Sequence, residues 1–279
     1  MQTHLICYAD SNMSISQRLC TKSAKEVGKI DKVVEYSPHD IDPYFFKRYR
    51  NILEAEQRGG GRGYWLWKPY IVDDYIRKTQ PGDILIYCDS GVEWVNSVYR
   101  LIDQLFTEIY EGENDIFLFS NGFRQIDWCK VEVMSKMFGV PGKWDYAGQG
   151  YTHYKQVQAS VIIMRVNEYT REFASRWLAW SCIPGFIDDQ LNATQLPEFR
   201  EHRNDQSIIT NLAIEDGIKL HWWPAQYGGP LKGYHPDDTY PQMFYHHRRR
   251  NEEWLIETQR LGLPIDQAIQ RFMNQPKNI

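Results

Sequence analysis

The sequence lacks the features that mark membrane, secreted and nucleic-acid-binding proteins. It contains no apolar run near the roughly 18 residues of a membrane-spanning helix. Its N-terminus has neither a basic region nor a long apolar segment, so it does not resemble a signal peptide. The formal net charge is -4 and long basic runs are missing, which argues against nucleic acid as a partner. We therefore expect a cytoplasmic protein without a transmembrane segment.

Cysteine is sparse as well, and its spacing excludes two further kinds of structure. The chain has 5 cysteines, which are scattered and never form a C-x-x-C pair. An odd, scattered set supports neither a disulfide framework nor a structural zinc site built from paired thiolates. A reducing compartment is the better match, in agreement with the cytoplasmic expectation.

What the sequence does have is enough apolar and aromatic content for a sizeable core. Of its 279 residues, 42% are hydrophobic and 24% are charged, which is typical of folded domains rather than disordered chains. The 10 Trp and 18 Tyr residues offer flat apolar faces with a polar tip, which suit sugar rings or bases. We expect most of them to fill the core.

Short apolar runs alternate with amphipathic segments along the chain. We expect strands at 5–8, 32–36, 83–88, 115–120, 158–166 and 218–222. We expect helices at 14–28, 43–53, 69–78, 98–109, 128–138, 168–182, 204–217 and 252–272. This alternation predicts an α/β fold with a mostly parallel sheet and helices on both of its faces.

The apolar run 84–87 ends in an acid that is followed by small residues. Asp89 comes directly after this expected strand, and Ser90 and Gly91 follow it. In open α/β sheets, ligands bind beyond the carboxyl ends of the strands. An acid there can hold a divalent metal, and the small residues let a phosphate approach. The alternative is that Asp89 only caps the next helix or turn.

A basic, glycine-rich segment at 58–69 precedes that strand. It matches neither the Walker pattern nor a G-x-G-x-x-G before a helix. Arg58, Arg62 and Lys68 could still neutralise a diphosphate. The alternative is a surface loop followed by an aromatic core segment.

Acids and histidines in the second half are further candidates. Asp205 stands at the start of an expected helix, where it is either a functional carboxylate or the N-cap of that helix. Asp188 and Asp189 stand in an irregular polar segment. His246 and His247 precede three arginines. They are either metal ligands or part of a solvated basic run. Asp and His together suit Mn²⁺ or Mg²⁺, which would hold a diphosphate and stabilise it as a leaving group.

Four of these segments together resemble a known family. The sequence is similar to GT-A fold glycosyltransferases, which use nucleotide-sugar donors, and more closely to small capsular-polysaccharide-type glycosyltransferases. These combine a Gly-Tyr-Trp-Leu-Trp-Lys-Pro segment, a Tyr-Cys-Asp-Ser-Gly strand end, an Asp-Gln-Ser-Ile helix start and a late His-His-Arg. All four occur here in that order, at 63–69, 87–91, 205–208 and 246–248.

The resemblance implies a fold and a reaction. The fold would be a single GT-A-like, Rossmann-like domain over residues 1–279. Residues 1–120 would form the nucleotide-binding half, and residues 121–279 the acceptor-binding and catalytic half. The reaction would be that of a hexosyl- or pentosyltransferase in polysaccharide biosynthesis. It would move a sugar from a nucleotide-diphosphate donor, by family habit a UDP-sugar, to a hydroxyl of a glycan or glycoconjugate.

The resemblance also implies roles for residues that would bind the donor. Asp89 would stand at the first acid of the family's Asp-x-Asp motif and bind Mn²⁺ and the diphosphate, with Ser90 beside it. Gly91 occupies the place of the second acid, a departure that leaves fewer carboxylates or a metal held through water. His246 or His247 would supply a late metal ligand.

The same resemblance places the remaining donor contacts. Tyr8, Ala9 and Asp10 would face the nucleotide base and ribose. Arg62 and Lys68 would lie near the diphosphate or the donor sugar.

Asp205 is implied to face the reacting carbon or the acceptor hydroxyl. As a general base it would deprotonate the acceptor for a single inverting displacement. Alternatively, Asp205 and Gln206 only position the sugar and the reaction retains configuration. Asp188 and Asp189 are rivals for the role of the base.

Two other functions remain open from the sequence. A carbohydrate-binding module without turnover would account for the Trp and Tyr content but not for the arginines of the glycine-rich segment. A metal-dependent phosphohydrolase would account for Asp89 at a strand end, but the haloacid-type Asp-x-Asp-x-Thr pattern fails at Gly91.

Overall fold

The computed structural model describes residues 1–56, 62–105, 115–139, 154–225 and 240–277. Within this part of the chain a six-stranded sheet has the order β2-β1-β3-β6-β5-β7. Its strands are β1 (Thr3–Tyr8), β2 (Lys32–Tyr36), β3 (Ile84–Cys88), β5 (Ile116–Arg124), β6 (Lys155–Arg165) and β7 (Leu220–His221). Only β6 runs antiparallel to its neighbours in this sheet, so the predicted mostly parallel α/β sheet is confirmed.

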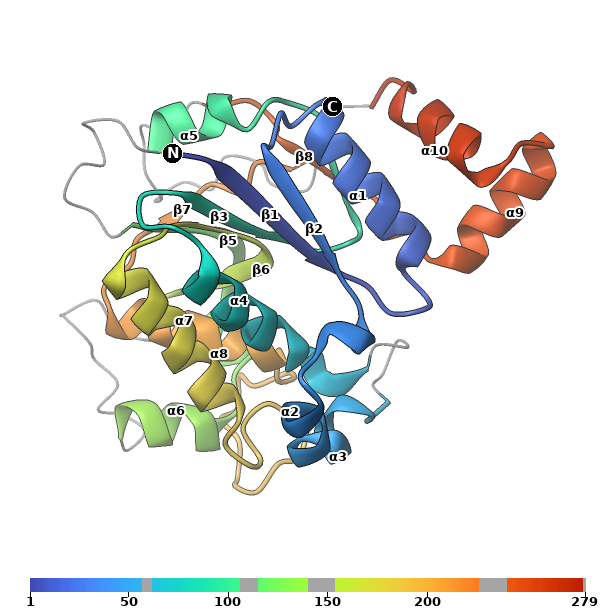
Figure 1. Ribbon diagram of the computed structural model, residues 1–279. Helices are drawn as coiled ribbons and strands as arrows, with labels where there is room; N and C mark the ends of the chain where they lie inside the picture. Colours follow the sequence, from blue (N-terminus) through green and yellow to red (C-terminus); the bar gives the residue numbers. More distant parts are fainter. Residues whose placement is uncertain (57–61, 106–114, 140–153, 226–239, 278–279) are drawn as a thin grey trace.

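Helices cover both faces of the sheet (Figure 1). One face carries α1 (Ser14–Glu26) and α5 (Tyr99–Leu105). The other carries α4 (Trp67–Lys78), α7 (Glu168–Ser181) and α8 (Asn204–Glu215). The shorter helices α2 (Pro43–Arg48), α3 (Arg50–Leu53) and α6 (Val131–Phe138) lie beyond this second layer.

Alternation along the central strands fills these two layers. Because neighbouring strand residues point to opposite faces, Ile6 and Leu85 pack toward α4, α7 and α8. Leu5 and Ile86 pack toward α1 and α5. These side chains are almost completely buried, and they fix the register that brings the ends of β1 and β3 side by side.

A second, small sheet was not expected from the sequence. The strands β4 (Val92–Trp94) and β8 (Phe244–His246) pair antiparallel, and Val92 lies opposite His246. Three-residue strands carry too little periodicity to stand out in a sequence. The pairing is important for the site because it brings the late His-His-Arg segment next to residue 91.

The closing segment forms two helices instead of the expected single one. Helix α9 (Asn251–Leu261) ends at Gly262, whose φ of 64° is left-handed, and Pro264 precedes α10 (Ile265–Met273). A glycine followed by a proline is a strong helix-stopping signal. The hairpin packs on α1 through a buried cluster that includes Leu19, Trp254 and Phe272. Among the described residues, no helix is long and apolar enough to span a bilayer.

Candidate functional site

A cavity of about 1190 Å³ lies at the carboxyl ends of β1 and β3. Its wall also includes the start of α8, the middle of β6 and the chain after β8. Clefts at this edge of an open α/β sheet are the usual place for ligands. The sequence-predicted residues that line it are Tyr8, Ala9, Asp10, Arg62, Lys68, Asp89, Ser90, Gly91, Asp189, Asp205 and His246.

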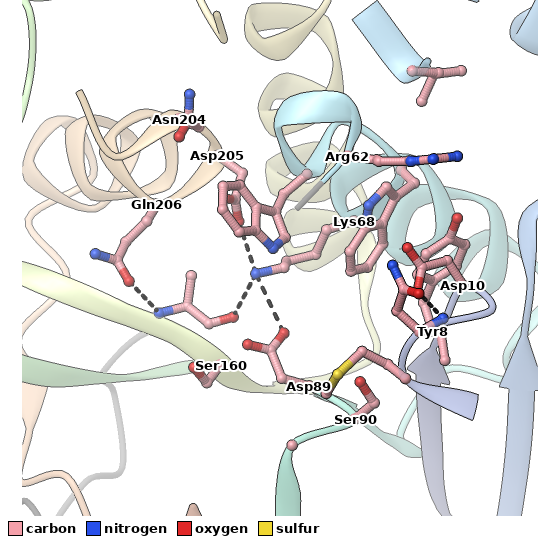
Figure 2. Close-up of a pocket in the computed structure, with 18 of the residues that line it drawn as sticks. Tyr8, Asp10, Arg62, Lys68, Asp89, Ser90, Ser160, Asn204, Asp205 and Gln206 are labelled. Carbon is pink, nitrogen blue, oxygen red and sulfur yellow. Dashed lines mark hydrogen bonds and ion pairs between the residues drawn. The ribbon is translucent and has the colours of Figure 1, made fainter. Parts of the chain in front are cut away.

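The centre of the cavity wall is an ion-pair cluster of three side chains (Figure 2). The ammonium of Lys68 lies 3.0 Å from Asp205 Oδ2 and 3.4 Å from Asp89 Oδ1. It also donates a hydrogen bond of 3.2 Å to the carbonyl of Ala159 on β6. Lys68 and Asp205 are each 3% exposed, so this lysine is a fixed cation between two carboxylates.

The glycine-rich motif is what places Lys68 there. Residues 57–61 lie outside the described residues, whereas the Tyr-Trp-Leu-Trp-Lys part of the motif lies within them. Leu66 is buried in the core, and Trp67 stacks on Tyr8 with ring centroids 3.9 Å apart. Helix α4 begins at Trp67, so Lys68 projects from its first turn into the cavity.

Asp89 is held in its ionised form. Its carboxylate accepts a hydrogen bond from the Tyr87 hydroxyl and faces the Lys68 ammonium. Burial alone would raise the pKa of Asp89, but Lys68, the Tyr87 hydroxyl and His246 together hold it below its ordinary value. Its side chain is 26% exposed, so it can contact a ligand in the cavity. The carboxylate therefore lies on the cavity wall, beyond the strand end where the sequence placed it.

The pKa of Asp205 is shifted in the opposite direction from that of Asp89. Burial, reinforced by the charge of Asp89, raises the pKa of Asp205 to about 6, although Lys68 opposes the shift. The alternative that Asp205 is the N-cap of its helix is wrong, because Arg203 holds the N-cap position and Asp205 lies within the first turn of α8. A carboxyl that titrates near neutrality at a cavity wall is a candidate acid or base.

Burial also affects Lys68 itself. Desolvation would lower the pKa of this ammonium, but the carboxylates of Asp205 and Asp89 raise it above its ordinary value. The lysine therefore stays charged at neutral pH.

Backbone strain accompanies the cavity. Trp65, Asn204 and Arg248 line it and have φ values of 57°, 48° and 55°, which are left-handed. Such conformations in residues other than glycine persist where the surroundings impose them, and they cluster at functional sites.

Asp188 and Asp189 have different surroundings, and of the two only Asp189 lines the cavity. Lys130 is completely buried, lies 3.1 Å from Asp188 Oδ1 and donates a 2.7 Å hydrogen bond to the carbonyl of Asp188. Asp188 thus anchors its segment to α6. Asp189 reaches the cavity wall, and its Oδ1 accepts a 3.0 Å hydrogen bond from Asn204 Nδ2.

The two histidines point in opposite directions. His246 lines the cavity, and burial, followed by the charge of Arg248, lowers its pKa to about 4. His247 lies between Trp254 and Phe272, with ring centroids 6.0 Å and 5.7 Å away. Burial lowers the pKa of His247 to about 3, so both rings are neutral at pH 7.

Other residues of the wall lie on α8 and β6, and of these Gln158 and Ser160 had no clear signal in the sequence. Gln206 Oε1 accepts a 3.2 Å hydrogen bond from the Ala159 amide, which ties α8 to β6. Gln158 Nε2 donates to Ser160 Oγ over 2.8 Å, and both side chains line the cavity. The only hint was that polar residues alternate with apolar ones at the start of this otherwise apolar strand.

The donor set does not fit the predicted Mn²⁺ or Mg²⁺. Among the residues that the structure describes, no three His, Cys, Asp or Glu side chains gather in a way that could hold a metal ion. Asp89 already faces an ammonium, and His246 Nε2 lies 3.4 Å from the guanidinium Nε of Arg248. A divalent cation would have to approach next to the positive charges of Lys68 and Arg248.

Comparisons with known proteins support the fold. No protein-family model and no curated protein matches this sequence. The bifunctional glycosyltransferase WbbM matches with a TM-score of 0.50 and 13% identity over 99% of this chain and 50% of that one. Mouse xyloside xylosyltransferase 1 gives 0.49 and 11% identity, over 89% of this chain and 98% of that one. The galactosyltransferase LgtC gives 0.44 and 14% identity, over 99% and 98%.

The match to WbbM extends over nearly the whole chain. It shows that the chain shares the GT-A glycosyltransferase fold, as the motifs predicted.

Proposed function

We propose that this chain is a glycosyltransferase that takes a sugar from a nucleotide-diphosphate donor and transfers it to a hydroxyl of a glycan or glycoconjugate. The observation that carries the proposal is the Asp89–Lys68–Asp205 cluster in a cavity at the carboxyl edge of a GT-A sheet. UDP-sugars are the first donors to test, and hexoses and pentoses are both candidates for the sugar.

In this proposal, residues 1–120 bind the donor nucleotide and residues 121–279 bind the acceptor. Tyr8, Ala9 and Asp10 line the cavity next to β1 and would face the base and ribose within the nucleotide-binding half, 1–120. The stacked Tyr8 and Trp67 rings give that wall a flat apolar surface. The start of α8 and the chain near Asp189 belong to residues 121–279 and would face the acceptor. Both halves contribute to one cavity, in agreement with a single domain.

Asp205 would act as the general base. In this scheme the acceptor hydroxyl gives its proton to the Asp205 carboxylate while its oxygen forms a bond to the anomeric carbon. The bond from that carbon to the diphosphate oxygen breaks, and its electron pair leaves with the nucleoside diphosphate. One displacement of this kind inverts the configuration. The pKa of about 6 suits a base that works near neutral pH.

The alternative is that Asp205 and Gln206 position the donor sugar and the reaction retains configuration. Within the inverting scheme, Asp189 is the nearer rival of Asp205 as the base, since it lines the cavity while Asp188 is tied to Lys130. Neither scheme is written with a step on a divalent ion, because the predicted ligands do not suit one.

The test is incubation of the protein with a panel of nucleotide sugars and measurement of nucleoside diphosphate release. We expect release from one donor class, stimulated by an acceptor glycan, and the anomeric configuration of the product separates the two schemes. If no donor is consumed and a free glycan alone raises the melting temperature, the chain is a carbohydrate-binding module instead.

A further inference from the structure

We propose that this site binds the diphosphate of its donor without a divalent metal ion, with Arg248 as the cation that contacts the diphosphate and Lys68 as the cation that balances Asp89 and Asp205. The inference rests on the proposed function, and it differs from the manganese-assisted scheme that the motifs suggested. Four observations carry it.

The first observation concerns position 91, where a second metal-binding acid would stand. A Cβ atom on Gly91 would lie 2.9 Å from the Cα and 3.3 Å from the backbone N of Arg248. Contacts to backbone at such distances cannot be relieved by a side-chain rotation. The Arg248 amide also donates a 3.1 Å hydrogen bond to the Gly91 carbonyl, which keeps the two segments together. The packing therefore requires glycine where an acid would be needed.

The second observation is the position of Arg248. The residue lines the cavity, its side chain is exposed and its backbone is left-handed with a φ of 55°. Its guanidinium Nε lies 3.4 Å from His246 Nε2, so this ring nitrogen already faces a cation. A guanidinium binds phosphate oxygens through two parallel hydrogen bonds, which makes it a suitable partner for a diphosphate.

The third observation is the position of Lys68. Its ammonium lies between two carboxylates, 3.4 Å from Asp89 and 3.0 Å from Asp205, in a nearly dry setting. Two unbalanced carboxylates at a cavity wall would repel an incoming diphosphate. The fixed charge of Lys68 offsets one of the two negative charges, which is part of what a bound cation would otherwise do.

The fourth observation concerns clusters of potential metal ligands in the described part of the chain. Within it, no group of three His, Cys, Asp or Glu side chains is arranged to hold a metal. Asp89 and His246 are the cavity-lining residues that the motifs assigned to the metal, and each already faces a cationic side chain.

The experiment measures nucleotide binding by isothermal titration calorimetry after exhaustive removal of metal with EDTA and gel filtration. The probes are UDP, GDP, CDP and ADP, each with and without 1 mM MnCl₂ (a concentration of about this order saturates typical divalent sites). The variants are the wild type, Arg248→Gln and Arg249→Gln. Arg249 is the matched control, because its guanidinium lies over the Trp254 and Phe272 rings, 5.2 Å and 4.6 Å from their centroids.

We expect one nucleotide to bind the metal-free wild type, with a Kd that MnCl₂ changes by less than about twofold. Arg248→Gln should weaken that binding about tenfold or more, since it removes a charged hydrogen-bond donor. Arg249→Gln should match the wild type.

Three results would overturn the inference. Binding that appears only with MnCl₂, or that MnCl₂ tightens about tenfold or more, would restore the metal scheme and leave the proposed function intact. Equal affinity of the wild type and Arg248→Gln would remove Arg248 as the diphosphate contact. Absence of binding by all four nucleotides, with and without metal, would overturn the proposed function and the inference with it.

Discussion

The ammonium of Lys68 lies 3.0 Å from Asp205 Oδ2, and both side chains are almost completely buried. This contact joins the first turn of α4 to the first turn of α8, two helices on the same face of the sheet. The same ammonium also faces Asp89, and it limits how far burial raises the pKa of Asp205. Most of the expected effects below follow from it.

Replacement of Lys68 should be costly to the fold. Lys68→Met leaves two buried or half-buried carboxylates without their cation, so we expect a loss of about 3–5 kcal/mol in unfolding free energy. The loss should shrink below about pH 6, because protonated Asp205 needs no counter-charge. Urea unfolding at pH 5 and pH 8 measures both effects.

Lys78→Met is the control for that experiment. Lys78 pairs with Asp74 on the surface, with a side chain that is 68% exposed, so its loss should cost less than about 1 kcal/mol. A Lys68→Met protein as stable as the Lys78→Met protein would show that the cluster has no energetic importance.

Replacement of Asp205 should separate binding from turnover. Asp205→Asn keeps the shape of the side chain but cannot accept the acceptor's proton, so transfer should fall by about 10²–10⁴-fold. Nucleotide affinity should change little. Initial rates and calorimetry on the same preparation measure the two effects, and an undiminished rate would eliminate Asp205 as the base.

The pH dependence of transfer should report the same carboxyl. A general base works when deprotonated, and burial raises the pKa of Asp205 to about 6. The rate should therefore rise with pH up to about 6 and level off above it. A profile of kcat/KM from pH 4.5 to pH 8 checks this, and a rate that is flat across pH 6 would contradict it.

Gly91 should not tolerate even a methyl group. Gly91→Ala places a Cβ 2.9 Å from the Arg248 Cα, so the β4–β8 segment must shift. We expect a loss of about 1–3 kcal/mol in stability, the range for overpacked sites, and weaker nucleotide binding. Thermal unfolding and calorimetry measure the two effects. A variant with wild-type stability and affinity would show that residue 91 is free to carry a side chain.

Much of the fold could be predicted from the sequence, because its strands are short buried runs with clear turn signals. The run 84–87 lies within β3, with the cavity at its end, and the helix expected from residue 43 begins there as α2, where the Asp42 carboxylate caps the first turn. The periodicity of the closing segment was misleading, since Gly262 and Pro264 divide it into two helices.

The contacts within the site could not be predicted in the same way. The sequence placed Lys68 near the donor, but its pairing with Asp205 joins two distant helices and leaves no local pattern. Likewise, neighbouring residues at a strand end face opposite ways, so the sequence could not tell which of His246 and His247 faces the cavity. The clash that requires glycine at position 91 depends on the β4–β8 pairing, which the sequence did not suggest.

The most direct test of the central claim is the release of nucleoside diphosphate from a nucleotide-sugar donor by the wild type and by Asp89→Ala. The account predicts donor-dependent release by the wild type and its loss in Asp89→Ala, with the circular dichroism spectrum unchanged. An Asp89→Ala protein that is fully active would contradict it, because the site would then lie elsewhere.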